Sequence, residues 1–215
     1  MKTSTHALTI WTDEPRRTGL AWFSSNLGRL IRQFHVGLLS RFISLLGEVS
    51  TPGMKPIGFL QAWALRRMGA RCDSNEVWIG SHVCFEYPHH VVFGKRVVLG
   101  ADSRLTARSE IVLGDDFLSA PGLYINTGTH DPVTLVPQSS PVHIGAGVWC
   151  GTRVTICAGV NIGDNAVIGA SSLVLHDLPP RHLAVGTPCK PCRLLPEPDQ
   201  AITRWSNFRA RGRSS

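Results

Sequence analysis

The feature that most constrains the fold of this chain is an aliphatic residue that recurs at every sixth position. In the clearest block the recurring residues are Ile144, Cys150, Ile156, Ile162, Ile168 and Val174. The next residue is usually glycine, and the fourth residue after each member is small or β-branched. The same step occurs upstream at Leu113, Ser119 and Ile125. Chance does not produce such a run in register, so the repeat must reflect the architecture.

A period of six matches neither the 3.6-residue period of a helix nor simple strand alternation. It is typical of a solenoid in which three flat faces close one triangular coil, so that residues eighteen apart stack. Ile144 is then expected against Ile162, Cys150 against Ile168 and Ile156 against Val174, at the usual inter-strand spacing of about 4.8 Å. The glycine or alanine after each inward residue is expected to fit the tight corners. The sequence therefore predicts a mainly β solenoid.

The composition of the chain limits its fold class and the kinds of partner that it can bind. The 215 residues include 21 glycines and 14 prolines without low complexity, which favours many turns in one globular domain with short appendages. The net charge of +7 at pH 7 permits an anionic partner, namely nucleic acid, a membrane surface or a phosphorylated ligand. Charge alone does not choose among these partners.

Four segments follow from changes of pattern along the chain. They are a polar lead-in (1–25), a helical region (26–76) interrupted by "TPGMKP", the repeat region (77–195) and a basic tail (196–215). Arg32 and Arg41 interrupt the apolar helical run, which is too short between them to span a bilayer. The helix either packs on the main domain or a neighbouring subunit, or lies on an anionic membrane face.

The six cysteines do not form the compact framework of a small secreted domain. Asp13 and Glu14 precede any apolar segment of signal-peptide length, so we expect reduced thiols and a cytoplasmic chain. Cys189 and Cys192 have the spacing of half a zinc site. No second pair stands at zinc-ribbon spacing, and we interpret both as small apolar residues.

The repeat is interrupted by "INTGTHDPVTLVPQSS", residues 125–140. Asn126, His130 and Asp131 stand there where apolar residues would be expected. Ile125 and Ile144 are nineteen positions apart, one more than a full coil, so a loop over 126–143 must leave the prism and return. Long loops held by a rigid scaffold are where function concentrates.

Three stretches together resemble a known family: "IGAGVWCGTRVTICAGVNIGDNAVIGASSLV", "TGTHD" and "DLPPRHLAVGTPCKPCRLL". They are similar to the hexapeptide-repeat acyltransferases, nearest to the sugar and polysaccharide O-acetyltransferases of the colanic-acid, galactoside and maltose type. The resemblance covers residues 77–195 and implies a left-handed parallel β-helix, a homotrimer with active sites between subunits, and acetyl-CoA as co-substrate without a metal. It further implies acetyl transfer to a hydroxyl of a sugar, in a cell-surface polysaccharide or its precursor.

The chemistry of such a transfer needs a base. An alcohol is a poor nucleophile at neutral pH, and a histidine has a pKa near the working pH. The resemblance places this role on His130, which would take the acceptor proton and later protonate the CoA thiolate without an acyl-enzyme. Asp131 either orients the imidazole or binds the acceptor, or it caps a turn before Pro132. Asn126 is a weaker candidate for a sugar hydroxyl.

The resemblance also implies a cofactor-binding set. Small residues would leave backbone open to the pantetheine arm, which Ala170 would hydrogen-bond, while Trp149 lines the thioester end or packs at a subunit contact. The N–H group of Gly151 or Thr152 would stabilise the oxyanion. Basic side chains would meet the phosphates. The full set is Trp149, Gly151, Thr152, Gly169, Ala170, Lys190 and Arg193. His176 stands where several relatives have lysine, so no contact is assigned there.

Three alternatives remain beside this interpretation. The acceptor could be a small molecule, such as an antibiotic or serine. A zinc enzyme of the γ-carbonic-anhydrase type would need paired histidines on one coil, but His89 and His90 are adjacent and expected on opposite sides of a strand. A non-catalytic anion-binding module is the third alternative. We expect no nucleic-acid partner, because no basic–aromatic stacking motif is present. The basic tail could still contact acidic membrane or polymer.

Overall fold

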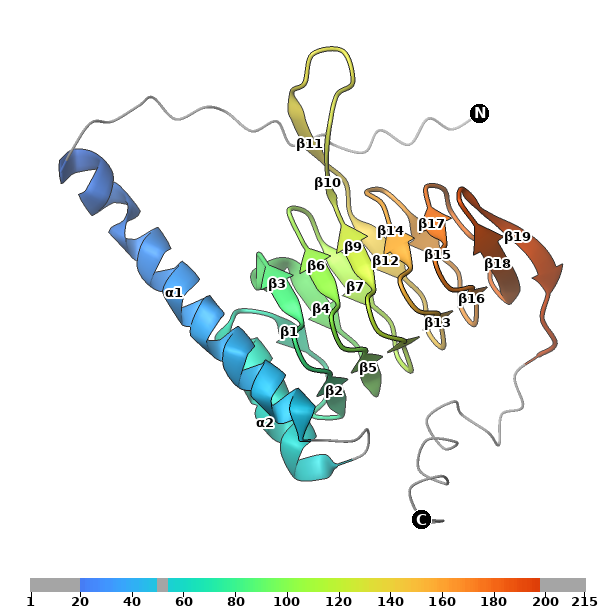
Figure 1. Cartoon of the computed structure of the whole chain (residues 1–215), viewed down its shortest axis with the longest axis horizontal. Coiled ribbons are helices and arrows are strands. Elements are labelled where there is room, and N and C mark those ends of the chain that lie inside the picture. The colour runs from blue at the N-terminus through green and yellow to red at the C-terminus, as the bar shows by residue number, and fades with distance from the viewer. Residues whose placement is uncertain (1–19, 50–53, 198–215) are drawn as a thin grey trace.

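The computed structural model describes residues 20–49 and 54–197, which form two helices followed by a parallel β-helix (Figure 1). Helix α1 (Leu20–Glu48) begins earlier than the predicted boundary between residues 25 and 26, and helix α2 is Lys55–Arg67. The predicted helical region is too long at its other end, because strand β1 already begins at Arg71. The basic tail lies almost wholly outside the described residues.

The strands form three sheets that run along the prism. Sheet A contains β1 (Arg71–Cys72), β4 (Val91–Phe93), β7 (Ile111–Leu113), β12 (Val142–Ile144) and β15 (Asn161–Ile162). Sheet B contains β2 (Val77–Ile79), β5 (Val97–Leu99), β8 (Leu118–Ser119), β13 (Trp149–Cys150), β16 (Val167–Ile168), β18 (His182–Gly186) and β19 (Cys189–Leu194). Sheet C contains β3 (Cys84–Glu86), β6 (Arg104–Thr106), β9 (Tyr124–Asn126), β14 (Thr155–Ile156) and β17 (Leu173–Val174).

The predicted stacking of residues eighteen apart is confirmed. Ile144 pairs with Ile162 in sheet A, Cys150 with Ile168 in sheet B, and Ile156 with Val174 in sheet C, all in parallel register. The recurring aliphatic side chains fill the prism and are buried. The coils form a left-handed parallel β-helix, which confirms the predicted fold class.

The reason for the recurring glycine differs from the one expected. The left-handed backbone of each corner falls two residues later, for example at Arg153 (φ 57°) and Asn165 (φ 59°). The glycine itself is required by the next coil, since a Cβ on Gly151 would lie 2.7 Å from the backbone nitrogen of Ala170. Close approach between coils, rather than a special dihedral angle, therefore selects glycine after the inward residue.

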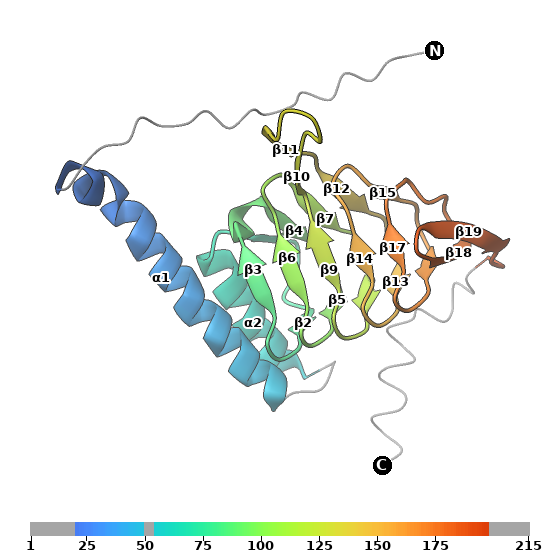
Figure 2. The same ribbon diagram turned by 45° about the horizontal axis from the view of Figure 1, so that its top comes forward.

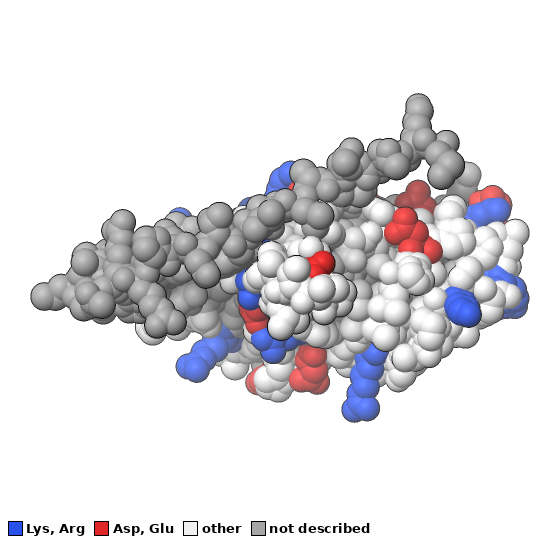
Figure 3. Space-filling model, turned by 90° about the horizontal axis from the view of Figure 1, so that it is seen from above, with Lys and Arg blue, Asp and Glu red and all other residues white. Residues whose placement is uncertain are grey.

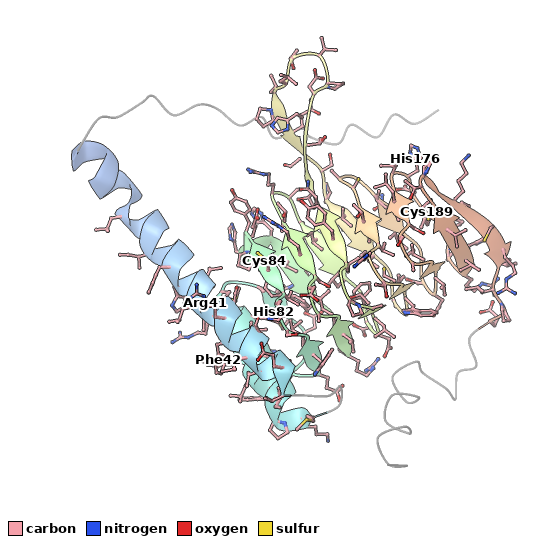
Figure 4. The ribbon with its side chains drawn as sticks, viewed as in Figure 1. Arg41, Phe42, His82, Cys84, His176 and Cys189 are labelled. Atoms are coloured by element: carbon pink, nitrogen blue, oxygen red, sulfur yellow. The ribbon has the colours of Figure 1, made fainter. Side chains whose placement is uncertain are left out.

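The first coil is covered by the helices. Gln61 on α2 is fully buried. Its Nε2 donates to the Ile79 carbonyl (2.7 Å) and its Oε1 accepts the Ile79 N–H (3.0 Å). Because β2 is the last strand of sheet B, this amide satisfies backbone groups that would otherwise lack a partner at the end of the solenoid. His82 lies beside α1 in Figure 4, 3.5 Å from Glu48. Within the described ranges, neither helix is long and apolar enough to cross a membrane.

The interruption of the repeat forms an antiparallel hairpin of β10 (Gly128–His130) and β11 (Pro137–Ser139) that stands out from the prism (Figures 1 and 2). It joins β9 of sheet C to β12 of sheet A. The inserted residues therefore replace a single corner of one coil, where six residues would normally suffice. The prediction that a loop over 126–143 leaves the prism and returns is confirmed, and the chain moves on to the adjacent face rather than once around the prism.

Candidate functional site

A pocket of about 470 Å³ lies between this hairpin and the edge at which sheet C turns into sheet A. Its lining consists of coil and hairpin residues, namely Thr106, Arg108, Asn126, Gly128, Thr129, His130, Pro137 and Gln138. The structure thus brings together His130 and Asn126, two of the residues predicted from sequence. It adds Thr106 and Arg108, which sequence reasoning did not assign. Asp131 is not among the lining residues.

The hairpin holds His130 through its strand pairing. His130 pairs with Pro137, and Gly128 pairs with Ser139. At the base, Thr127 is fully buried, and its hydroxyl accepts the N–H of Ser109 (2.8 Å) on the neighbouring coil. Asn126 Oδ1 accepts the N–H of Gly128 (3.0 Å). The imidazole itself is exposed at the pocket wall. This arrangement presents a titratable base to a substrate on a braced support.

Asp131 caps the turn of the hairpin. Its Oδ1 accepts the backbone N–H of Thr134 (2.7 Å), the hydroxyl of Thr134 (2.9 Å) and the N–H of Val133 (3.0 Å). These hydrogen bonds, with that of the Thr134 backbone the strongest, hold the pKa of Asp131 below its ordinary value. The structure therefore shows the turn-capping role that the sequence had left open. A role toward the base or acceptor stays a prediction.

The predicted cofactor residues lie along a different edge, where sheet B turns into sheet C. Trp149 is in register with Val167, which pairs with Leu183, and Leu183 pairs with Arg193 on the terminal strand. The indole of Trp149 is 43% exposed. Arg193 and Trp149 therefore belong to one row of residues that runs along the stack.

A second row lies two residues further along each coil. Gly151, Gly169 and Val185 follow one another there, and Val185 pairs with Lys190. Lys190 is exposed at the end of the stack. Ala170, which follows Gly169, is also exposed. A backbone edge lined by small residues and ending in two basic side chains fits a long thiol ester that carries phosphates.

The structure separates the two candidate oxyanion donors. The N–H of Gly151 donates to the Ile168 carbonyl (2.8 Å), so it serves the stacking of coils and is unavailable to a ligand. The prediction that allowed Gly151 in this role was wrong. The N–H groups of Thr152 and Ala170 find no acceptor among the described residues, and both residues are exposed. These two groups are the donors that a thioester at this edge could use.

One chain does not bring the base and these donors together. His130 belongs to the corner between sheets C and A, whereas Thr152 and Ala170 belong to the corner between sheets B and C. In Figures 1 and 2 the hairpin projects from the upper edge, while β13 lies on the lower side. The full width of sheet C therefore separates the two halves of the predicted site.

The histidine pair is arranged differently from the prediction. His89 and His90 lie on a 3₁₀ turn, Pro88–His90, and not on a strand, because Tyr87 takes a left-handed backbone (φ 57°) after β3 ends. Their ring centroids are 4.2 Å apart, so the two rings do not point to opposite faces. In the part of the chain that the structure describes, no three histidine, cysteine or acidic side chains are grouped to hold a metal ion.

The six cysteines are all free thiols. Burial raises the pKa of Cys72 to about 11, and burial also raises the pKa values of Cys157 and Cys189. A raised pKa opposes the thiolate form that a nucleophilic cysteine needs. Cys189 lies with His176 at the C-terminal end of the stack (Figure 4). These three thiols are therefore unsuited to form an acyl-enzyme.

Comparison with known proteins identifies the class of this site. No family model matches the chain. Galactoside O-acetyltransferase of Escherichia coli K12 is 31% identical over 141 residues, which are 63% of this chain and 69% of that protein. An Escherichia coli K12 acetyltransferase named for colanic acid biosynthesis is 33% identical over 130 residues, 60% of this chain and 71% of its own length.

Solved structures agree with these relatives. Galactoside acetyltransferase in complex with coenzyme A has a TM-score of 0.65 at 25% identity, covering 79% of this chain and 84% of that one. A maltose O-acetyltransferase from Clostridium difficile 630 also has a TM-score of 0.65, at 26% identity, covering 78% of this chain and 88% of that one. Fold and site thus define a CoA-dependent acetyltransferase. The chain belongs to the hexapeptide-repeat acetyltransferase family.

The two roles considered for Asp131 can be separated by substitution. Asp131→Asn is expected to keep the turn, because an amide oxygen can still accept hydrogen bonds, whereas Asp131→Ala removes all three. Amide hydrogen exchange at Val133 and Thr134 would measure this. Because the pKa of Asp131 is lowered, the protection it provides is complete above about pH 4 and falls as the pH is lowered through the folded pKa. Asp131→Asn should lack that acid dependence. If the Asn and Ala variants lose turnover equally, the carboxylate charge itself acts on the base or acceptor.

Proposed function

We propose that this protein is an O-acetyltransferase that moves an acetyl group from acetyl-CoA to a hydroxyl of a sugar, with His130 as general base. The observation that carries the proposal is the pocket beside the hairpin, which is lined by the hairpin histidine, His130. Relatives that acetylate galactosides and one named for colanic acid biosynthesis support a sugar acceptor. We place that sugar in a cell-surface polysaccharide or its precursor.

The proposed reaction is a direct transfer. The imidazole of His130 removes the proton of the acceptor hydroxyl as its oxygen attacks the thioester carbonyl carbon. The N–H of Thr152 donates to the carbonyl oxygen as negative charge develops on it. The carbon–sulfur bond then breaks, and the imidazolium returns the proton to the departing thiolate. The products are an acetyl ester and free CoA, so the base ends the cycle neutral.

His130→Ala tests this assignment. Turnover should fall by roughly 100- to 10,000-fold, the usual contribution of a positioned base. Affinity for acetyl-CoA should be kept, because the cofactor residues lie on another edge. Thiol release would be followed across sugars, nucleotide-sugars, serine and small antibiotics, and acetyl-CoA binding by calorimetry.

A matched control for that variant is His35→Ala, since His35 is exposed on α1 away from the pocket. Turnover in this control should equal that of the parent. Unchanged turnover in His130→Ala would remove the residue from the mechanism. Activity confined to serine or an antibiotic would retain the enzyme class and overturn the sugar.

We further propose a homotrimer with its active sites between subunits. The separation of His130 from Thr152 and Ala170 within one chain supports this assembly, since a working site must contain both. In a closed threefold ring, the same pair of surfaces meets at every interface. The corner between sheets C and A of one subunit can then face the corner between sheets B and C of the next.

Complementation between two inactive variants would test the shared site. His130→Ala removes the base, and Ala170→Trp blocks the exposed edge beside Gly151. When the two variants are unfolded and refolded together in equal amounts, roughly one interface in four should combine two intact halves. Turnover should therefore recover to about a quarter of the level of identically treated parent protein. No recovery, with mixed oligomers verified by tags, would place both halves in one subunit.

We also propose that α1 makes a peripheral contact with a membrane. Exposed apolar residues recur there at spacings of three, four and seven, namely Leu27, Ile31, Phe34, Leu38 and Leu45. This stripe is separate from Leu39 and Ile43, which are buried in the core. Arg41 is exposed on the same helix, and the chain carries a net charge of +7, which suits anionic headgroups. A cytoplasmic location stays a prediction.

Phe34→Glu should weaken this contact, because Phe34 is 75% exposed at the centre of the stripe. Co-sedimentation would be measured with phosphatidylcholine vesicles with and without phosphatidylglycerol. We expect the parent to bind the anionic vesicles and to be released by salt. Glu48→Gln, on the same helix, is the control and should bind at least as well as the parent. Absence of parent binding, or equal binding by Phe34→Glu, would contradict the proposal.

A further inference from the structure

The pocket beside His130 contains a buried hydroxyl without a partner. Thr106 is only 7% exposed, and its Oγ1 makes no hydrogen bond with any described residue. Thr106 lines the pocket at the end of β6. Buried hydroxyl groups are normally paired, because leaving one unpaired is unfavourable. Because Oγ1 itself has almost no exposed surface, the side chain must rotate toward the pocket for a ligand hydroxyl to complete its hydrogen bonding.

The main chain around this hydroxyl is already fixed. Thr106 lies in register between Glu86 of β3 and Asn126 of β9. Its carbonyl accepts the N–H of Thr127 (3.1 Å) and the hydroxyl of Thr127 (3.2 Å). The backbone of Thr106 is therefore fixed by the stacked coils, and rotation about χ1 is the freedom left to its hydroxyl.

A cation lines the same pocket. Arg108 is exposed two residues after Thr106, and its guanidinium lies 5.4 Å from the centroid of the Tyr87 ring. Its stem runs against Gly128 at the base of the hairpin, where a glycine Cβ would approach Arg108 Cδ to 2.7 Å. The contacts with the Tyr87 ring and with the base of the hairpin hold the Arg108 side chain beside the pocket.

The charge of the pocket has one sign. None of its lining residues carries a carboxylate. Arg108 is the residue among them with a permanent positive charge. Glu86, in register with Thr106, is ion-paired with Arg104. Seen from above the hairpin, much of the visible surface is uncharged, and both basic and acidic side chains are scattered over the rest of it (Figure 3). A guanidinium in such surroundings selects a carboxylate or phosphate, which it can bind through two parallel hydrogen bonds.

We propose that the acceptor is an anionic sugar, whose acidic group binds Arg108 while one of its hydroxyls pairs with Thr106 Oγ1. The hydroxyl to be acetylated is thereby directed to His130. A pocket of about 470 Å³ has room for one or two sugar rings. This inference rests on the proposed sugar acetyltransferase function. The acidic group is the carboxylate of a uronic acid or the phosphate of an activated sugar.

Matched acceptors test the charge requirement. Galactose, galacturonate and galactose 1-phosphate share one ring and differ mainly in the acidic group. For the parent, kcat/KM with at least one acidic sugar should exceed that with galactose by about 10-fold or more. Preference for galacturonate would identify a carboxylate as the bound group, and preference for galactose 1-phosphate a phosphate.

Arg108→Gln should lower kcat/KM for the preferred acidic sugar by about 10- to 100-fold, mainly through KM, and leave galactose unchanged. Arg104→Gln is the matched control, because it removes the same charge from β6 but its side chain pairs with Glu86 and does not line the pocket. It should leave the selectivity of the parent. Thr106→Val should weaken acidic and neutral sugars alike.

A binding measurement separates failure of this inference from failure of the proposed function. Galacturonate and galactose 1-phosphate would be titrated by NMR into His130→Ala, with and without Arg108→Gln. Binding that depends on Arg108 supports the anionic pocket even if no transfer is observed. Equal binding of galactose and both acids, unaffected by Arg108→Gln, would overturn the inference, while loss of turnover in His130→Ala would still support the base.

Discussion

The hydrogen bonds between successive coils are the interaction on which the rest of this structure depends. They fix Ile144 over Ile162 and Cys150 over Ile168. Stacked strands of successive coils must therefore have matching lengths. The same close approach explains glycine at position 151, where a side chain would collide with Ala170. It also explains the fully buried Gln61, which supplies the paired donor and acceptor that a preceding coil would have offered to Ile79. A solenoid of this kind is rigid along its edges, and the candidate site is built on those edges.

This rigidity has a chemical consequence. The backbone N–H groups that face along the stack, such as that of Gly151, are consumed by the neighbouring coil. Donors for a ligand can come only from the corner residues that follow, which leaves Thr152 and Ala170 exposed on one edge. The candidate base does not come from the same edge. His130 is instead supplied by the hairpin that replaces a corner between sheets C and A. The assembly that we propose would bring these two edges together across a subunit interface.

The sequence predicted the features that depend on the period. Strand register, the buried aliphatic set and the protrusion around His130 all follow from counting residues, since backbone pairing allows only one coil length. Features set by local dihedral angles were missed. The left-handed Tyr87 turns His89 and His90 onto a 3₁₀ turn, and nothing in the spacing indicates this. Thr106 and Arg108 were also missed, because the six-residue step is not strictly kept before Leu113, and this obscured which of those positions meet the hairpin. The unpaired hydroxyl of Thr106 is visible only when its neighbours are in place.

The proposed binding of two negatively charged substrates explains where the basic residues near the site lie. Lys190 and Arg193 are exposed at the end of the edge that we predict to bind acetyl-CoA, and Arg108 lines the pocket in which we propose that the acceptor binds. If both the donor and the acceptor carry negative charge, as we propose, the two substrates repel each other when they are brought together in the site. Cations placed at the far ends of the two substrates offset that repulsion without surrounding the reacting atoms. The centre can then contain a neutral imidazole and backbone donors, which is the environment in which a proton can move from hydroxyl to thiolate.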